Sequence, residues 1–249
     1  MPYHVYVSKT AAELQRIAAG GRAVAVLPIG AVEQHGPHLS VGTDYLCAED
    51  AARLACGKIQ SDADFLLLPA IAYALSIEHI HVAGTLTLMP QTLISVLTDI
   101  GDSLLRLGVH KLVFVNGHGG NDSCIHIAGR LLRDKGLKVF MVNGGAIRDS
   151  LGAKEYHVHA DMIETSVMLA THPDMVRPEE ITQSLHDSID KWHESADCRG
   201  DLISFWYIDD IGVSGVVGDP MLATREYSER FLDGQTDKIA RALELAAAL

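Results

Sequence analysis

The chain of 249 residues is short of basic side chains and cysteine, and each shortage excludes a class of protein. It carries 20 Lys and Arg against 32 Asp and Glu, a formal net charge of −12. This acidity argues against nucleic acid and against an anionic membrane as partner, because clustered Lys and Arg bind both. The four cysteines form no CxxC pair, and no apolar run reaches the roughly 18 residues of a membrane span. The N-terminus also lacks a secretion-type segment, so we expect a cytoplasmic protein with reduced thiols.

Strand-like and helix-like segments alternate along the chain, a pattern typical of a mainly parallel sheet covered by helices. Buried strands are predicted at 23–29, 65–71, 112–115 and 137–142, and helices at 11–19, 44–59, 90–107, 122–135, 161–170 and 227–249. The pattern assigns no element to residues 177–221. We therefore expect one α/β domain over residues 1–249, a three-layer α/β/α fold with a mainly parallel central sheet.

Histidines and acidic residues gather in the segments that follow the predicted strands. These segments are residues 33–44, 76–81, 116–121 and 157–164. In open parallel sheets, ligands bind outside the carboxyl ends of the strands. The convergence of four such segments on one edge predicts a functional site there.

The first segment offers metal ligands. Glu33 and His35 are two residues apart, so in an extended chain they can face one cavity, and their side chains suit Zn²⁺, Mn²⁺ or Fe²⁺. Asp44 could bridge two cations through its two oxygens, although the residues alone slightly favour an ordinary helix N-cap. For His38, an ordinary loop histidine is favoured over a hydrogen-bond donor to the site.

The third segment places His118 between glycines, where its ring can be aimed at a metal with little steric competition. The N–H groups of Gly119 and Gly120 could stabilise an oxyanion. A dinucleotide-binding GxGxxG loop is excluded because Asp122 stands where its last glycine would be. Walker, HExxH and GxSxG motifs are absent as well.

The remaining candidates follow the second and fourth strands. Glu164 lies in the first turn of a predicted helix, where an acid is also favoured simply by the helix dipole. His159 could reach the same cavity as a proton carrier. Three candidates follow the second strand: Ser76, Glu78 and His79. For these residues, the sequence supports contact with substrate and a purely structural role equally.

Five motifs together make the sequence resemble the creatininase family of creatinine amidohydrolases. They are LPIGAVEQHGPHLSVGTD (27–44), EHIHVAGTLTL (78–88), VNGHGGN (115–121), HADMIETS (159–166) and VVGDP (216–220). The resemblance covers nearly the whole chain in the family's order. It implies an α/β fold with a binuclear metal centre and a homo-oligomer, which we expect to be a hexamer.

The resemblance also implies a ligand set. Glu33, Asp44 and His118 would hold one cation, while His35 and Asp44 would hold the other. In the creatinine-cleaving enzymes a carboxylate stands two residues after the histidine that matches His118. Here that position is Gly120, so the resemblance gives Glu164 as the substitute.

A second departure concerns the substrate. The creatinine-cleaving enzymes carry a tryptophan four residues before the histidine that matches His159. Here Glu155 stands at that position with Tyr156 beside it. We therefore expect a family member that does not cleave creatinine, with Glu155 and Tyr156 as substrate contacts. Other branches of the family deformylate a pyrimidine intermediate, process a redox-cofactor precursor peptide or open cyclitol-derived rings.

The expected activity is hydrolysis of a C–N bond in a small cyclic amide or formamide. Two divalent cations (zinc, manganese or iron) would hold a bridging hydroxide, with His159 and Glu164 as catalytic side chains. One alternative is a metal-dependent hydrolase of a C–C bond or ring in a cyclitol-derived ketone. A non-catalytic metal-binding assembly protein is disfavoured, because closed structural sites are often rich in cysteine.

Overall fold

The central element is a five-stranded sheet of order β1-β3-β2-β4-β5. The computed structural model describes residues 3–143, 157–181, 205–211 and 214–249. All neighbouring strands of this sheet are parallel. The strands are β1 (Tyr3–Val5), β2 (Ala23–Ile29), β3 (Asp64–Leu67), β4 (Lys111–Asn116) and β5 (Lys138–Asn143). The predicted α/β fold with a mainly parallel sheet is confirmed.

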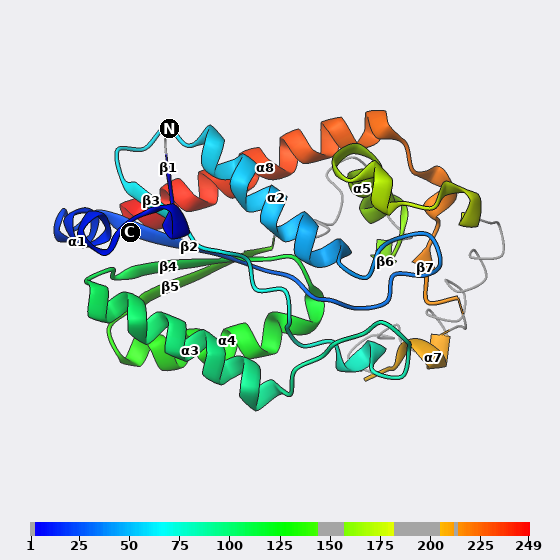
Figure 1. The fold of residues 1–249 in the computed structure, drawn as a ribbon, viewed down its shortest axis with the longest axis horizontal. Coiled ribbons are helices and arrows are strands. Elements are labelled where there is room, and N and C mark those ends of the chain that lie inside the picture. Colours follow the sequence, from blue (N-terminus) through cyan, green and yellow to red (C-terminus); the bar gives the residue numbers. More distant parts are fainter. Residues whose placement is uncertain (1–2, 144–156, 182–204, 212–213) are drawn as a thin grey trace.

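Helices cover both faces of this sheet, giving three layers (Figure 1). On one face lie α2 (Thr43–Lys58) and α8 (Arg225–Ala248), and on the other α3 (Pro90–Leu107) and α4 (Asp122–Asp134). The central strand β2 is buried along its whole length. Because successive strand residues point to opposite faces, Val24 packs in the α2–α8 core while Ala25 packs in the core beneath α3 and α4.

Local signals in the sequence set several helix ends. Helix α1 (Ala11–Ala19) begins with a capping box between Thr10 and Glu13. Helix α3 begins at Pro90 and is capped at its C-terminus by Gly108, whose φ of 93° is left-handed and suits glycine. Helix α5 (Met162–Thr171) begins one residue later than predicted, because Asp161 is its N-cap. Short 3₁₀ turns lie at Tyr6–Ser8, Ile77–His79, Gly119–Asn121, Pro173–Met175, Pro178–Glu180 and Pro220–Leu222.

Two parts of the prediction were wrong or incomplete. The second predicted strand was expected to reach residue 71, but β3 ends at Leu67, and only Ile71 returns to form a bridge with Ile29. The short strand β1 and the antiparallel pair β6 (His157–His159) and β7 (Val217–Gly218) were not predicted. Strands of two or three residues are too short to show an alternating pattern.

The segment that the sequence left unassigned is partly described. It contributes helix α7 (Ile208–Ile211) and strand β7, while residues 182–204 and 212–213 lie outside the described residues. Within the described ranges, no helix combines the length and apolar character needed to cross a bilayer. Figure 1 places α5, α7 and the β6–β7 pair at one end of the molecule, beyond the carboxyl ends of the central strands.

Candidate metal centre

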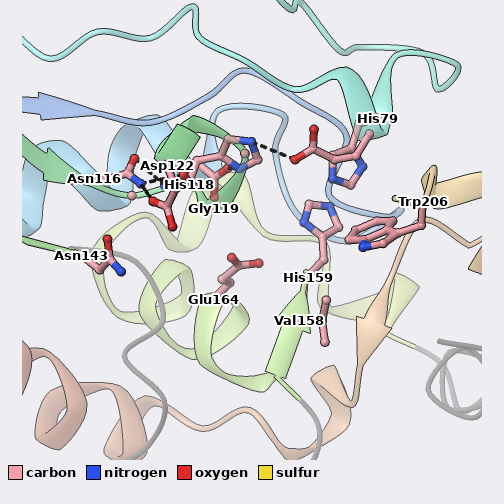
Figure 2. A pocket seen from close by; sticks show the side chains of 14 residues that line it. His79, Asn116, His118, Gly119, Asp122, Asn143, Val158, His159, Glu164 and Trp206 are labelled. Carbon is pink, nitrogen blue, oxygen red and sulfur yellow. Dashed lines mark hydrogen bonds and ion pairs between the residues drawn. The ribbon is translucent and has the colours of Figure 1, made fainter. Parts of the chain in front are cut away.

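A cavity of about 450 Å³ lies at this end of the sheet. Its walls include six predicted site residues with reactive side chains, together with the predicted Gly119 and Gly120: Asp44, Glu78, His79, His118, His159 and Glu164. Figure 2 shows His118, Glu164 and His159 around one space, with Trp206 beside His159 and Asn143 on the opposite side. The loops after β2, β3 and β4 therefore converge with the β6–α5 segment, as the sequence predicted.

Asp44 joins the two histidines of the centre. Its Oδ1 lies 3.3 Å from Nε2 of His35, and its Oδ2 lies 3.0 Å from Nδ1 of His118. The interpretation of Asp44 as a helix N-cap is wrong, because Gly42 is the N-cap and Asp44 is the second residue of α2. One carboxylate oxygen thus lies beside each histidine, and it meets His118 at Nδ1.

Glu33 and His118 meet on the opposite side of Asp44. Glu33 is fully buried, and its Oε2 lies 3.2 Å from Nε2 of His118. The same Oε2 accepts a hydrogen bond of 2.5 Å from the hydroxyl of Ser76. Ser76 was predicted to contact substrate; the structure places it fully buried against Glu33 instead.

Glu164 approaches the centre from the start of α5. Its Oε2 accepts a hydrogen bond of 2.6 Å from the backbone N–H of Ala160 and lies 3.6 Å from Nε2 of His35. Ala160 has a φ of 52°, an uncommon backbone conformation for a residue with a side chain. The turn before α5 therefore holds Glu164 toward His35.

His159 stacks between two other histidines. Its ring centroid lies 4.3 Å from that of His35 and 4.2 Å from that of His79. Its Nε2 lies 2.8 Å from the carbonyl oxygen of Gln34, and its Nδ1 lies 3.6 Å from Oε1 of Glu33. The same Nε2 lies 3.0 Å from the side-chain amide nitrogen of Gln34, so the carbonyl and the amide contacts favour opposite tautomers of the ring.

The donor atoms fit divalent cations. Three groups each bring three ligand atoms within 4.8 Å of one another: Glu33–His35–Asp44, His35–His159–Glu164 and Glu33–His79–His159. His118 is in none of these groups, although it contacts both Glu33 and Asp44.

Unsatisfied buried atoms give a second sign of a metal site. Within the described part of the chain, Oε1 of Glu33, Nε2 of His35, Oδ2 of Asp44 and Nε2 of His118 are buried without a hydrogen-bond partner. Leaving such an atom unsatisfied costs about 1–3 kcal/mol. These four atoms all belong to predicted ligands and lie close together, so one or two cations bound between them would satisfy them.

The shifted pKa values of the buried carboxylates and of His35 are a further sign of a cation site. Burial raises the pKa of Glu33 to about 8 and that of Glu164 to about 8. Burial opposes a charge on His35 too, but Asp44, Glu164 and Glu33 outweigh it and raise the pKa of His35 to about 10. Protons therefore balance these carboxylates in the metal-free protein, and cations would replace them.

The remaining predicted substrate contacts fall into two groups. Glu78 and His79 line the cavity, as do Gly119 and Gly120. Glu155 and Tyr156 lie outside the described residues. His38, which the sequence read as an ordinary loop residue, is buried with its Nε2 2.8 Å from the hydroxyl oxygen of Thr165, and burial lowers its pKa to about 4.

Sequence reasoning missed Gln34, a buried amide behind the histidines. Its Oε1 accepts a 3.0 Å hydrogen bond from the N–H of Gly36, which leaves its Nε2 to donate to Nδ1 of His79 at 2.8 Å. Its position between Glu33 and His35 was the available signal. Trp206, from the unassigned segment, also lines the cavity, and its ring meets His79 edge-on at 6.3 Å.

Comparisons with known proteins agree with this geometry. The family model for creatininase, described as creatinine amidohydrolase, matches residues 8–243. The chain is 32% identical over 222 residues to the mycofactocin precursor peptide peptidase of Mycobacterium tuberculosis (strain CDC 1551 / Oshkosh), covering 87% of this chain and 82% of that protein. It is 30% identical over 186 residues to the creatinine amidohydrolase of Pseudomonas putida, covering 66% of this chain and 70% of that protein.

A solved structure described as "Creatininase Mn" superposes with a TM-score of 0.76 at 26% identity, covering 96% of this chain and 98% of that one. The resemblance read from the motifs is thereby confirmed over almost the whole sequence. The chain belongs to the creatininase family and is a hydrolase that acts on C–N bonds.

Proposed function

We propose that the chain is an amidohydrolase with two divalent cations, zinc, manganese or iron. The ligands are Glu33, His35, Asp44, His118 and Glu164, and the substrate is a small molecule with a cyclic amide or formamide group. One observation carries the proposal: four unsatisfied buried atoms of these ligands converge beside an open cavity. When bound, such cations supply a Lewis acid and lower the pKa of water toward neutrality.

The chain supplies the proton transfer through His159. Burial lowers the pKa of His159 well below its ordinary value, so the resting ring is neutral. Its Nε2 lies against Gln34, 2.8 Å from the carbonyl oxygen and 3.0 Å from the side-chain amide nitrogen, and Nδ1 is the nitrogen that faces Glu33. Nδ1 therefore accepts the proton released by the attacking water and delivers it to the departing nitrogen.

The opposite wall of the cavity binds the carbonyl end of the substrate. Gly119 and Gly120 are in a 3₁₀ turn at the start of α4 and both line the cavity. We assign their backbone N–H groups to the oxygen of the carbonyl under attack, where charge develops.

A hydroxyl-rich ligand is the second candidate. Asn116, Asp122 and Asn143 form a polar part of the cavity wall, and such amide and carboxylate groups suit hydroxyl groups. This wall favours the alternative of a cyclitol-derived ketone. Inososes therefore belong in the substrate panel beside cyclic amides, formamides and short peptides.

Metal content and turnover test the proposal together. Protein purified without chelators should carry close to two cations per chain and hydrolyse one substrate class of the panel. His159→Asn should keep the cations and lose most of kcat, whereas the matched control His126→Asn, an exposed histidine of α4, should change neither. Wild-type protein without bound cations, or a fully active His159→Asn variant, would contradict the proposal. We also propose that the chain forms a hexamer. A sedimentation measurement that gives only the monomer mass would contradict this assembly.

A further inference from the structure

The ring of His118 lies among three carboxylates. Its Nδ1 faces Asp44, while its Nε2 lies 3.2 Å from Oε2 of Glu33 and 3.4 Å from Oε1 of Glu78. Glu78 comes from a different loop, the 3₁₀ turn Ile77–His79 that follows β3. Its side chain is 21% exposed and lines the cavity, so its carboxylate reaches the centre from the open side.

These distances match the spacing of ligands around one cation. Zinc ligands lie at about 2.0–2.2 Å from the metal, so two nitrogen or oxygen ligands of one cation lie roughly 3 Å apart. Nε2 of His118 is buried and has no hydrogen-bond partner within the described residues. The carboxylates of Glu33 and Glu78 lie within 3.4 Å of this nitrogen, but neither forms a hydrogen bond with it. A cation between them would satisfy all three groups.

The glycine at position 120 makes room for Glu78. A Cβ atom at Gly120 would lie 2.4 Å from Oε1 of Glu78, 2.4 Å from Nε2 of His118 and 2.8 Å from the carbonyl oxygen of Leu75. Real Cβ atoms do not approach that closely. A side chain at residue 120 and the side chain of Glu78 therefore cannot both occupy the space beside His118. In this chain Glu78 occupies it.

We propose that Glu78 is a ligand of the cation held by Glu33 and His118. The proposal rests on the metal centre proposed above and completes it. Each proposed cation then has a terminal carboxylate of its own, Glu78 at Nε2 of His118 and Glu164 beside His35, while Asp44 contacts Nδ1 of His118. This role differs from the substrate contact expected from the sequence.

Metal binding distinguishes the two roles without any substrate. Wild type, Glu78→Gln and Asp122→Asn are first stripped of metal and then titrated with MnCl₂ by calorimetry. Bound metal is also counted after dialysis. Asp122 is a matched control, because it lines the same cavity but its carboxylate accepts from Nδ2 of Asn116. We expect about two equivalents for wild type and Asp122→Asn. For Glu78→Gln we expect about one, or a second site weakened roughly tenfold or more.

The stability of the metal-free protein gives a second measurement. Metal-free Glu78→Gln should unfold at the wild-type temperature. A clearly lower temperature would attribute its metal loss to the fold and overturn the proposal.

The outcomes separate this inference from the proposed function. Glu78→Gln that binds manganese like wild type would overturn the role of Glu78 and leave the amidohydrolase centre standing. Wild-type protein that binds no manganese or zinc would overturn both.

Discussion

The hydroxyl of Ser76 donates a 2.5 Å hydrogen bond to Oε2 of Glu33, and both side chains are fully buried. Hydrogen bonds of this kind orient a ligating carboxylate and typically change metal affinity by about 10–100-fold when removed. We expect Ser76→Ala to weaken zinc or manganese binding by about that factor. Calorimetric titration of the metal-free protein measures it.

A second buried serine provides the control for Ser76. Ser228 on α8 is also fully buried, but it lies outside the ligand cluster. Ser228→Ala should bind metal with wild-type affinity. If Ser76→Ala also stays within about twofold of wild type, the hydrogen bond to Glu33 has no role in holding the cation.

An added methyl group should lower the stability of the protein at Gly120 but not at the neighbouring Gly119. At Gly120 a Cβ meets His118, Glu78 and the Leu75 carbonyl at 2.4–2.8 Å, whereas at Gly119 nothing lies within 4 Å. We expect Gly120→Ala to destabilise the protein by about 1–3 kcal/mol and to reduce metal content. Gly119→Ala should stay within about 0.5 kcal/mol and keep its metal. Urea unfolding of the metal-free variants measures the first effect, and equal stability of the two would contradict the crowding at Gly120.

The periodic elements of this fold could be predicted from sequence because their signals are local. Strand β2 and helices α1 and α3 have the predicted bounds, since a continuous apolar run, a capping box and the Pro90–Gly108 pair each act within a few residues. Strands β6 and β7 pair His157 with Gly218 and His159 with Val217, far apart in sequence, and have too few residues for a pattern. Their existence depends on tertiary contacts that no local signal encodes.

The candidate site could also be predicted only in part: its ligands could be predicted from sequence, but their hydrogen-bond partners could not. Residue types and strand ends predicted that Glu33, His35, Asp44 and His118 would meet, and the structure brings them together. The partners of these residues could not be predicted, because a hydrogen bond such as Ser76 to Glu33 depends on the packing of two separate loops. Asp44 shows the limit of local reasoning: its place at a helix start suggested a cap, but the direction of its side chain is set by His35 and His118.

Gln34 should act on turnover through the histidines that it holds. Its amide nitrogen lies 2.8 Å from Nδ1 of His79 and 3.0 Å from Nε2 of His159, and its backbone carbonyl oxygen lies 2.8 Å from the same Nε2. Gln34→Met keeps the size and removes the amide, so His79 and its stacking partner His159 lose a fixed orientation. A displacement of about 1 Å can cost roughly 100-fold in rate. We expect kcat on the best panel substrate to fall by about 10–100-fold, with KM and metal content nearly unchanged.

The control for Gln34 is Gln15→Met, an exposed glutamine of α1 that should leave kcat as it is. Nitrogen-15 NMR of the histidine rings gives a second measurement, because loss of the amide should change the tautomer signals of His79. A variant with wild-type kcat and unchanged ring signals would show that the amide positions neither histidine.

Removal of metal should make stability fall as the pH rises. Glu33 and Glu164 have folded-state pKa values of about 8 in the metal-free protein, above their ordinary 4.5, chiefly because of burial. An acid with a raised pKa stabilises the fold fully below its unfolded pKa, and this contribution is lost as the pH rises through the folded value. Burial lowers the pKa values of His38, His79 and His159, so these histidines oppose the trend below their ordinary 6.5. The free energy of unfolding of chelated protein should therefore decrease between about pH 6.5 and pH 8.

Cations should counter this decrease, because they bind the deprotonated ligands and so bind more tightly at higher pH. The stability gained on adding manganese should grow from pH 5 to pH 8, as measured by urea unfolding at several pH values. Glu164→Gln removes one titrating group and should flatten the slope of the chelated protein, whereas Glu229→Gln, an exposed carboxylate of α8, should not. Chelated protein whose stability is constant or rises between pH 6.5 and pH 8 would show that Glu33 and Glu164 are not buried together without a counter-charge.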